Sequence, residues 1–110
     1  MSDRSLRLKR KLRSGQPTFG AWLAFADPMA AEIMTGCGFD WLMIDAEHSP
    51  FTLDSLLPVL MAFNGRETVP LARVPRNDQV VIKQFLDLGV EGILVPMVNS
   101  PEEALYAVAA

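Results

Sequence analysis

The sequence predicts an α/β fold with a parallel sheet. Strand-like and helix-like segments alternate four times along the 110 residues, and this alternation favours right-handed βα units. The second expected strand, FDWLMID, is apolar on both faces, as is typical of a strand covered by helices. In a weak internal repeat, GFDWLMID from Gly38 and GVEGILVP from Gly89 each place a helix-ending glycine before a buried strand. Two architectures fit this pattern, a doubly wound sheet and part of a (β/α)8 barrel.

The order of the elements follows from their boundary signals. Residues 3–14 are expected to form a helix that Gly15 ends. Strands are expected at residues 18–25, 39–45, 69–74 and 92–97. The start signals of the later helices are Asp27-Pro28, Thr52, either Asn77 or Asp78, and the capping box Ser100-Pro101-Glu102-Glu103. Gly36 and Gly89 are stop signals. Pro58 conflicts with the interior of the helix expected over residues 52–63 and predicts a kink or a later start.

The composition and the motifs argue against several classes of protein. Half of the residues are hydrophobic, yet no apolar run approaches the roughly 20 residues that span a bilayer. The single cysteine, Cys37, allows no internal disulfide, which fits a reducing compartment. Since no signal-peptide pattern is present either, we expect a soluble, cytoplasmic protein without a membrane partner. No GxGxxG or GxxxxGK[ST] motif follows a strand, so nothing indicates a dinucleotide or P-loop site.

Positive charge is concentrated near the N-terminus. Six of the ten basic residues lie between Arg4 and Arg13. A basic segment can bind nucleic acid, but no aromatic residue is interleaved with these bases. We therefore interpret residues 1–15 as a basic helix with a solvated face and leucines toward the core, and we expect no nucleic-acid partner.

Polar side chains gather where the expected strands end. The second strand delivers Asp45, Glu47 and His48, the third carries Arg73, and the first has Trp22 near its end. Because the carboxyl ends of parallel strands meet at one edge of a sheet, chemistry in α/β folds is found there. The sequence therefore predicts a site at this edge.

The residue types at this edge indicate acid–base chemistry and anion binding. His48 is the only histidine, and a carboxylate such as Asp45 can fix its tautomer and raise its basicity, as a general base requires. Glu47 either belongs to the site or serves as an N-cap or salt-bridge partner. Arg73 either forms a structural ion pair, for instance with Asp45, or binds a carboxylate or enolate with its planar fork. For Trp22 the pattern favours core packing.

These residues lie in segments that resemble the HpcH/HpaI aldolase/citrate lyase family, the metal-dependent class II aldolases of 4-hydroxy-2-oxo acids. The segments are GAWLAFADPMAAEIMTGCGFDWLMIDAEHSP, PLARVPRND, IKQFLDLGVEGILVPMV and EEALYAVAA, and they cover nearly the whole chain from Phe19. The resemblance implies a (β/α)8 barrel that cleaves a 4-hydroxy-2-oxo acid to pyruvate and an aldehyde. It also implies a divalent ion (magnesium, manganese or cobalt) and a homo-oligomer, which is a hexamer in the family.

The same resemblance implies roles for individual residues. His48 is the general base, Arg73 holds the keto oxygen and stabilises the enolate, and Trp22 and Glu47 belong to the substrate site. The family places the acid that raises the basicity of the histidine at the position of Asp87. The residues themselves favour Asp45, because Asp87 ends a helix and so lies at the edge opposite the catalytic loops. Both assignments stay open.

One part of the family pattern has no counterpart in this sequence. The family's metal ligands, a glutamate and an aspartate, come from later strands, so we expect them beyond Ala110 and assign no metal ligand here. Residues 16–110 are then the first four βα units of the N-terminal half of a barrel, and residues 1–110 form one incomplete domain. The alternative to a lyase is a non-catalytic βα module that acts only through oligomerisation or partner binding.

Overall fold

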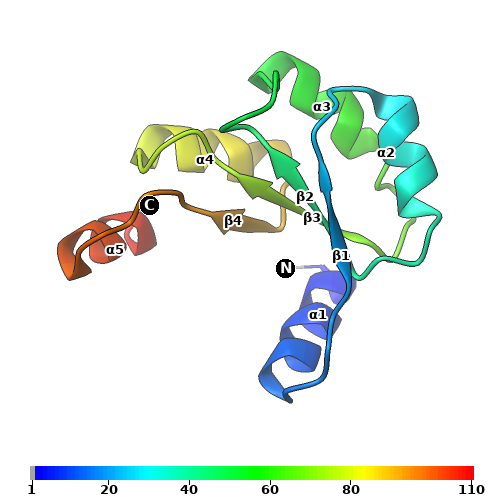
Figure 1. Cartoon of the computed structure of the whole chain (residues 1–110), viewed down its shortest axis with the longest axis horizontal. Coiled ribbons are helices and arrows are strands. Elements are labelled where there is room, and N and C mark those ends of the chain that lie inside the picture. Colours follow the sequence, from blue (N-terminus) through cyan, green and yellow to red (C-terminus); the bar gives the residue numbers. More distant parts are fainter. Residues whose placement is uncertain (1) are drawn as a thin grey trace.

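The computed structural model describes residues 2–110 and has four parallel strands that alternate with five helices (Figure 1). The strands are β1 (Gly20–Leu23), β2 (Trp41–Asp45), β3 (Val69–Arg73) and β4 (Gly92–Leu94), and the helices are α1 (Asp3–Arg13), α2 (Pro28–Thr35), α3 (Leu53–Met61), α4 (Gln79–Leu88) and α5 (Pro101–Val108). The strands lie side by side in sequence order. The predicted α/β class and the sequential parallel sheet are therefore confirmed.

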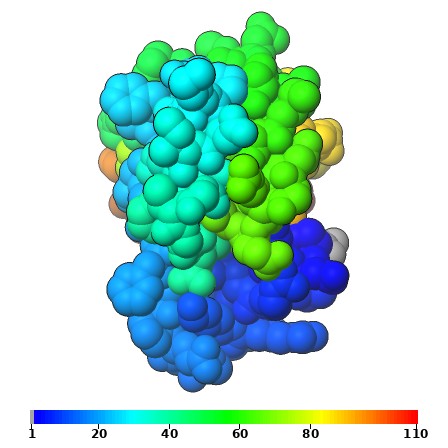
Figure 2. Space-filling view, turned by 90° about the vertical axis from the view of Figure 1, so that its right-hand side faces the viewer, coloured from blue at the N-terminus to red at the C-terminus, as the bar shows by residue number. Residues whose placement is uncertain are grey.

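The register of the strands gives the sheet two different faces. Leu42 and Ile44 of β2 belong to the fully buried core between the sheet and α2, α3 and α4. Figure 2 shows α2 and α3 side by side over this outer face. Trp22, Met43 and Leu71 are register partners on three neighbouring strands and share the other face, because side chains alternate along a strand. That inner face is the side that lines the interior of a barrel.

Helix α1 lies at the N-terminal ends of the strands (Figure 1). Arg4 Nε is 2.7 Å from Glu91 Oε2, and its Nη1 donates to the carbonyl of Arg66. Lys11 Nζ is 2.9 Å from Asp40 Oδ1. The sequence predicted a merely solvated basic face, but these bases tie α1 to the segments that lead into β2, β3 and β4.

The two outer strands are shorter than predicted. β1 begins at Gly20, which pairs with the first residue of β2, and it ends at Leu23 rather than residue 25. β4 ends at Leu94 rather than residue 97. Pro96 lacks the N–H that a further ladder bond needs, and Met97 adopts a positive φ of 57°.

The helix boundaries follow the predicted signals closely. α3 begins at Leu53, without the later start that Pro58 predicted, because Thr52 and Ser55 form a capping box. Pro58 lies on the exposed side of this helix, where water can reach the carbonyl group left without a donor. Asp78, rather than Asn77, is the N-cap of α4. Within residues 2–110, no helix is long and apolar enough to cross a bilayer.

Glycines on the inner face make room for large neighbours. A Cβ atom on Gly20 would meet the Trp41 indole at 2.1 Å. We expect Gly20→Ala to lower the free energy of unfolding by about 1–3 kcal/mol, since overpacking forces the ring or the strand to move. Gly36→Ala is the matched control, because its nearest neighbour would be 3.4 Å away. Urea unfolding of both variants measures the difference, and equal stabilities would contradict this packing.

The open sheet predicts self-association of the 110-residue chain. β1 and β4 each have one unpaired edge in the described structure, and large apolar side chains are exposed near the inner face, with Trp22 47% and Leu94 41% exposed. Unpaired edges and exposed apolar surface both favour association. Sedimentation equilibrium should give a mass above the 12.1 kDa of one chain. A stable monomer with a cooperative thermal transition would contradict this prediction.

Candidate active site

The centre of the candidate site is an ion pair between the last residues of two neighbouring strands. Asp45 of β2 and Arg73 of β3 are register partners, so their side chains leave the sheet on the same face. Arg73 Nε donates to Asp45 Oδ1 at 3.1 Å, and Nη2 donates to Oδ2 at 2.9 Å. This bidentate fork is a strong and directional form of the charge-assisted hydrogen bond.

Asp45 also shapes the loop that follows β2. Its Oδ1 accepts the backbone N–H groups of Glu47 at 3.1 Å and His48 at 3.2 Å, and the hydroxyl of Ser49 lies 3.4 Å from Oδ2. Burial alone raises the pKa of the Asp45 carboxyl, but Arg73 and the two backbone donors outweigh it and lower the pKa to about 2. Asp45 is therefore ionised at any physiological pH.

Glu47 is the carboxylate that reaches the imidazole of His48. Its Oε1 is 3.3 Å from His48 Nε2, and its Oε2 is 3.2 Å from Arg73 Nε. The sequence favoured Asp45 as the partner of the ring, but Asp45 contacts the backbone of His48 instead. The oxygens of Asp45 are already occupied by Arg73 and the loop. The His48 side chain is 70% exposed and so accessible to a ligand.

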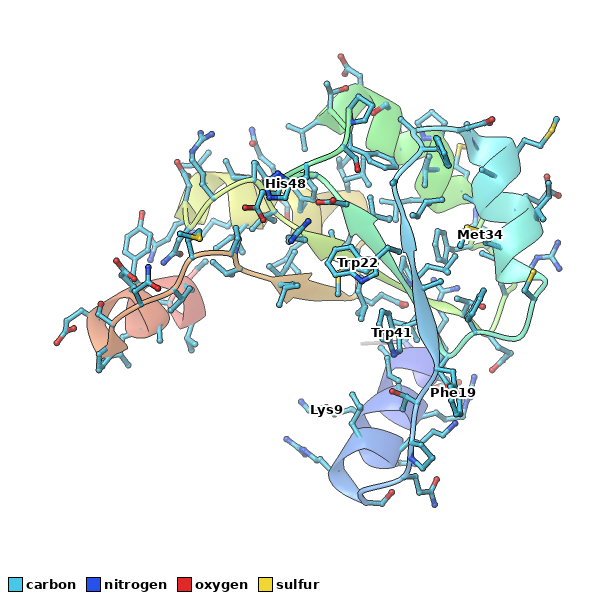
Figure 3. All side chains as sticks on the ribbon, in the orientation of Figure 1. Lys9, Phe19, Trp22, Met34, Trp41 and His48 are labelled. Atoms are coloured by element: carbon cyan, nitrogen blue, oxygen red, sulfur yellow. The ribbon has the colours of Figure 1, made fainter. Side chains whose placement is uncertain are left out.

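Trp22 completes the site from β1. The Arg73 Cζ atom lies 4.6 Å from the centroid of the Trp22 ring, which is a cation–π distance. In Figure 3, Trp22 lies between His48, which is above it, and Trp41, which is lower and nearer to α1. Sequence reasoning alone favoured core packing for Trp22, but the indole is only half-buried and covers a charged group.

Asp87 does not join this group of residues. It lies in the last turn of α4, whereas His48 follows the C-terminal end of β2. Because a helix in a βα unit runs back along the sheet, Asp87 is at the opposite edge, where it is exposed. No side-chain hydrogen bond or ion pair connects Asp87 to another residue of the described chain. Of the two carboxylates considered from the sequence, only Asp45 is therefore in the same site as His48.

The described residues do not form a metal site. Among residues 2–110, no group of three or more His, Cys, Asp and Glu side chains is arranged to hold a metal ion. Hard divalent ions need several free oxygen ligands, and Asp45 uses both of its oxygens for other partners. The divalent ion implied by the resemblance therefore does not fit the residues present here.

Comparison with known proteins finds a family match and several similar aldolases. The family model for HpcH/HpaI aldolase/citrate lyase matches residues 18–110. A hydroxypyruvate/pyruvate aldolase from Deinococcus radiodurans is 49% identical over 102 residues, and a 5-keto-4-deoxy-D-glucarate aldolase from Escherichia fergusonii is 42% identical over 104 residues. The crystal structure of an HpcH/HpaI aldolase/citrate lyase family protein from Burkholderia cenocepacia J2315 matches with a TM-score of 0.87 and 33% identity.

The chain belongs to the HpcH/HpaI aldolase/citrate lyase family. These matches cover 93% or 94% of this chain but only 37% and 41% of the two curated relatives, and 41% of the crystal structure. The chain thus spans about two fifths of the length of its relatives. Its four βα units are the N-terminal half of a (β/α)8 barrel, which confirms the barrel over the doubly wound sheet.

The lowered pKa of Asp45 predicts a specific loss of stability in acid. A folded-state pKa of about 2, against about 3.9 in an unfolded chain, contributes roughly 1–2 kcal/mol after allowance for solvent screening. This contribution is complete above about pH 5 and is lost progressively as the pH falls from about 5 to below 2. Urea unfolding between pH 6 and pH 2 should show this decrease in the free energy of unfolding. The Asp45→Asn protein should be less stable at pH 6, and its free energy of unfolding should decrease less over the same pH range. Parallel curves for both proteins would contradict the prediction.

Proposed function

We propose that this chain supplies the base and the enolate-binding arginine of a pyruvate aldolase active site. The reaction is the retro-aldol cleavage of a 4-hydroxy-2-oxo acid to pyruvate and an aldehyde. The observation that carries the proposal is the meeting of Arg73 with Asp45, Glu47 and the accessible His48 at the C-terminal ends of neighbouring strands. Chemistry in barrel enzymes takes place at this end. The names of the aldolase relatives support the same reaction class.

In this proposal His48 and Arg73 divide the chemistry between them. His48 takes the proton of the C4 hydroxyl as the C3–C4 bond breaks, so that C4 leaves as the aldehyde carbon. The bonding electrons pass to the C2 carbonyl and form the enolate of pyruvate, which then takes up a proton at C3 while protonated His48 releases the proton that it accepted. Arg73 faces the oxygen on which this negative charge develops, and such charge stabilisation is among the largest contributions to catalysis. Its bond with Asp45 raises the pKa of Arg73, so the guanidinium stays charged throughout.

A second candidate is a non-catalytic βα module. The open edges of β1 and β4 and the apolar residues exposed beside them favour association as a function in itself. The two candidates differ in what they require of His48: a lyase depends on the imidazole, whereas an association module does not.

A chimeric enzyme tests the aldolase proposal. Residues 18–110 would replace the matching segment of the Deinococcus radiodurans aldolase, to which the chain is 49% identical over 102 residues. We expect the chimera to release pyruvate from a 4-hydroxy-2-oxo acid, and His48→Ala to lower kcat by about 10²–10⁴-fold, the usual contribution of a general base. The 110-residue chain assayed alone should release none. A folded chimera that is inactive, or one that keeps its activity after His48→Ala, would overturn the proposal.

The role of Arg73 can be separated from its charge in the same chimera. Arg73→Lys keeps one positive charge but loses the planar fork that holds both Asp45 and a ligand. We therefore expect both a raised KM and a lowered kcat. Arg76→Lys is the matched control, since Arg76 lies three residues further on, is 66% exposed and, within residues 2–110, forms its one ion pair with Asp78. If Arg73→Lys and Arg76→Lys gave equal kcat and KM values, the planar fork of Arg73 would not be the property that the reaction requires.

A further inference from the structure

Trp22 is the one large aromatic side chain that connects β1 to the charged centre of the site. Its register partner on β2 is Met43, and Met43 in turn pairs with Leu71 on β3. Arg73 lies two residues beyond Leu71, on the same face of β3. Because β2 lies between β1 and β3, the path from the indole to the guanidinium of Arg73 crosses β2. Met43, beneath this path, is only 8% exposed.

The contacts of Arg73 divide its guanidinium into occupied and open parts. Nε and Nη2 face the two oxygens of Asp45, and Glu47 approaches the same Nε at 3.2 Å. The Trp22 ring lies against the same guanidinium, with Cζ 4.6 Å from the ring centroid. Within residues 2–110, no hydrogen bond uses Nη1, so both of its N–H groups are available to a ligand.

The fork alone does not fix the direction of this open edge. Two bonds to one carboxylate define an axis, and the guanidinium plane can still rock about it. A contact on the flat face removes that freedom, because a planar cation gains most from an aromatic ring when it lies parallel to it and close. Trp22 and Asp45 thus restrain different motions of the same group.

We propose that Trp22 is a positioning residue: it acts on the ligand through Arg73, by holding the guanidinium plane so that the Nη1 edge faces the open site. The matching ligand group is planar and anionic, a carboxylate or an enolate next to a carboxylate. The role of the Nη1 edge in binding substrate rests on the proposed function. The stacking itself is a property of the 110-residue chain and can be tested without any activity.

The first experiment observes the stack from the indole side. In a Trp41→Phe background, Trp22 is the only tryptophan, so fluorescence quenching by acrylamide reports its accessibility alone. Adding Arg73→Ala should uncover the face of the Trp22 ring that the guanidinium covers and so increase the quenching constant. Adding Arg76→Ala, which removes an exposed arginine of the following loop, should leave the constant unchanged. Equal quenching in the Arg73→Ala and Arg76→Ala proteins would overturn the proposal.

The second experiment observes the guanidinium side and separates positioning from packing. In the ¹⁵N-arginine spectrum, the Nε–H signal that Arg73→Lys removes belongs to Arg73. We expect this signal to be displaced upfield by the ring current of Trp22, and rotation about the Nε–Cζ bond to be slow enough to resolve the Nη protons. Trp22→Leu should abolish both effects, Trp22→Phe should retain them, and Trp41→Phe should not change them.

The outcomes of the two experiments decide the proposal. Loss of the ring-current displacement with faster rotation in Trp22→Leu, and retention of both in Trp22→Phe, would support a positioning role. Rotation that stays slow in Trp22→Leu would show that Asp45 holds Arg73 unaided, and this would overturn the proposal even if the quenching increased. Circular dichroism of each variant verifies that the α/β fold is retained. An inactive chimera would instead contradict the aldolase function and leave these spectra unchanged.

Discussion

The fork between Asp45 and Arg73 is the interaction on which the site depends. It joins the ends of β2 and β3, at the point where an apolar sheet gives way to a polar loop. The same carboxylate accepts two backbone N–H groups of that loop, so the positions of Glu47 and His48 follow from it. A largely buried ion pair is weak evidence for stability on its own. Here the pair also orders the loop that carries Glu47 and His48.

The charged residues at the two ends of the half-barrel have different roles. At the N-terminal end, Arg4 and Lys11 of α1 pair with acids beside the strand starts, and these contacts involve only structural residues. At the C-terminal end, the charges face an open surface and one of them is the accessible His48. This division follows from the parallel sheet, because all strand starts lie at one edge and all strand ends at the other. Contacts at the strand starts can therefore change in sequence without altering the residues of the site.

The sequence predicted those features that depend on local signals. Capping residues and glycines such as Thr52 and Gly89 located the helices, and the apolar run before Asp45 located the central strand. It also placed Asp45, His48 and Arg73 at one edge of the sheet. It did not predict which carboxylate contacts the imidazole, because that depends on how donors compete for the oxygens of Asp45. Nor did it predict the Trp22 stack, which crosses a strand and has no local pattern.

The two carboxylates of the loop are close in sequence but differ in their capacity for further contacts. Asp45 receives two N–H groups from Arg73, two from the backbone and a hydroxyl contact from Ser49, which fills the lone-pair sites that a carboxylate offers. A group in this state holds its neighbours in place but has no acceptor left for an imidazole. Within residues 2–110, the Glu47 carboxylate has two polar side-chain partners, Arg73 and His48, so its oxygens keep lone pairs available. Asp45 therefore acts as the fixed support of the site, and Glu47 is the carboxylate that can change partners when a ligand arrives.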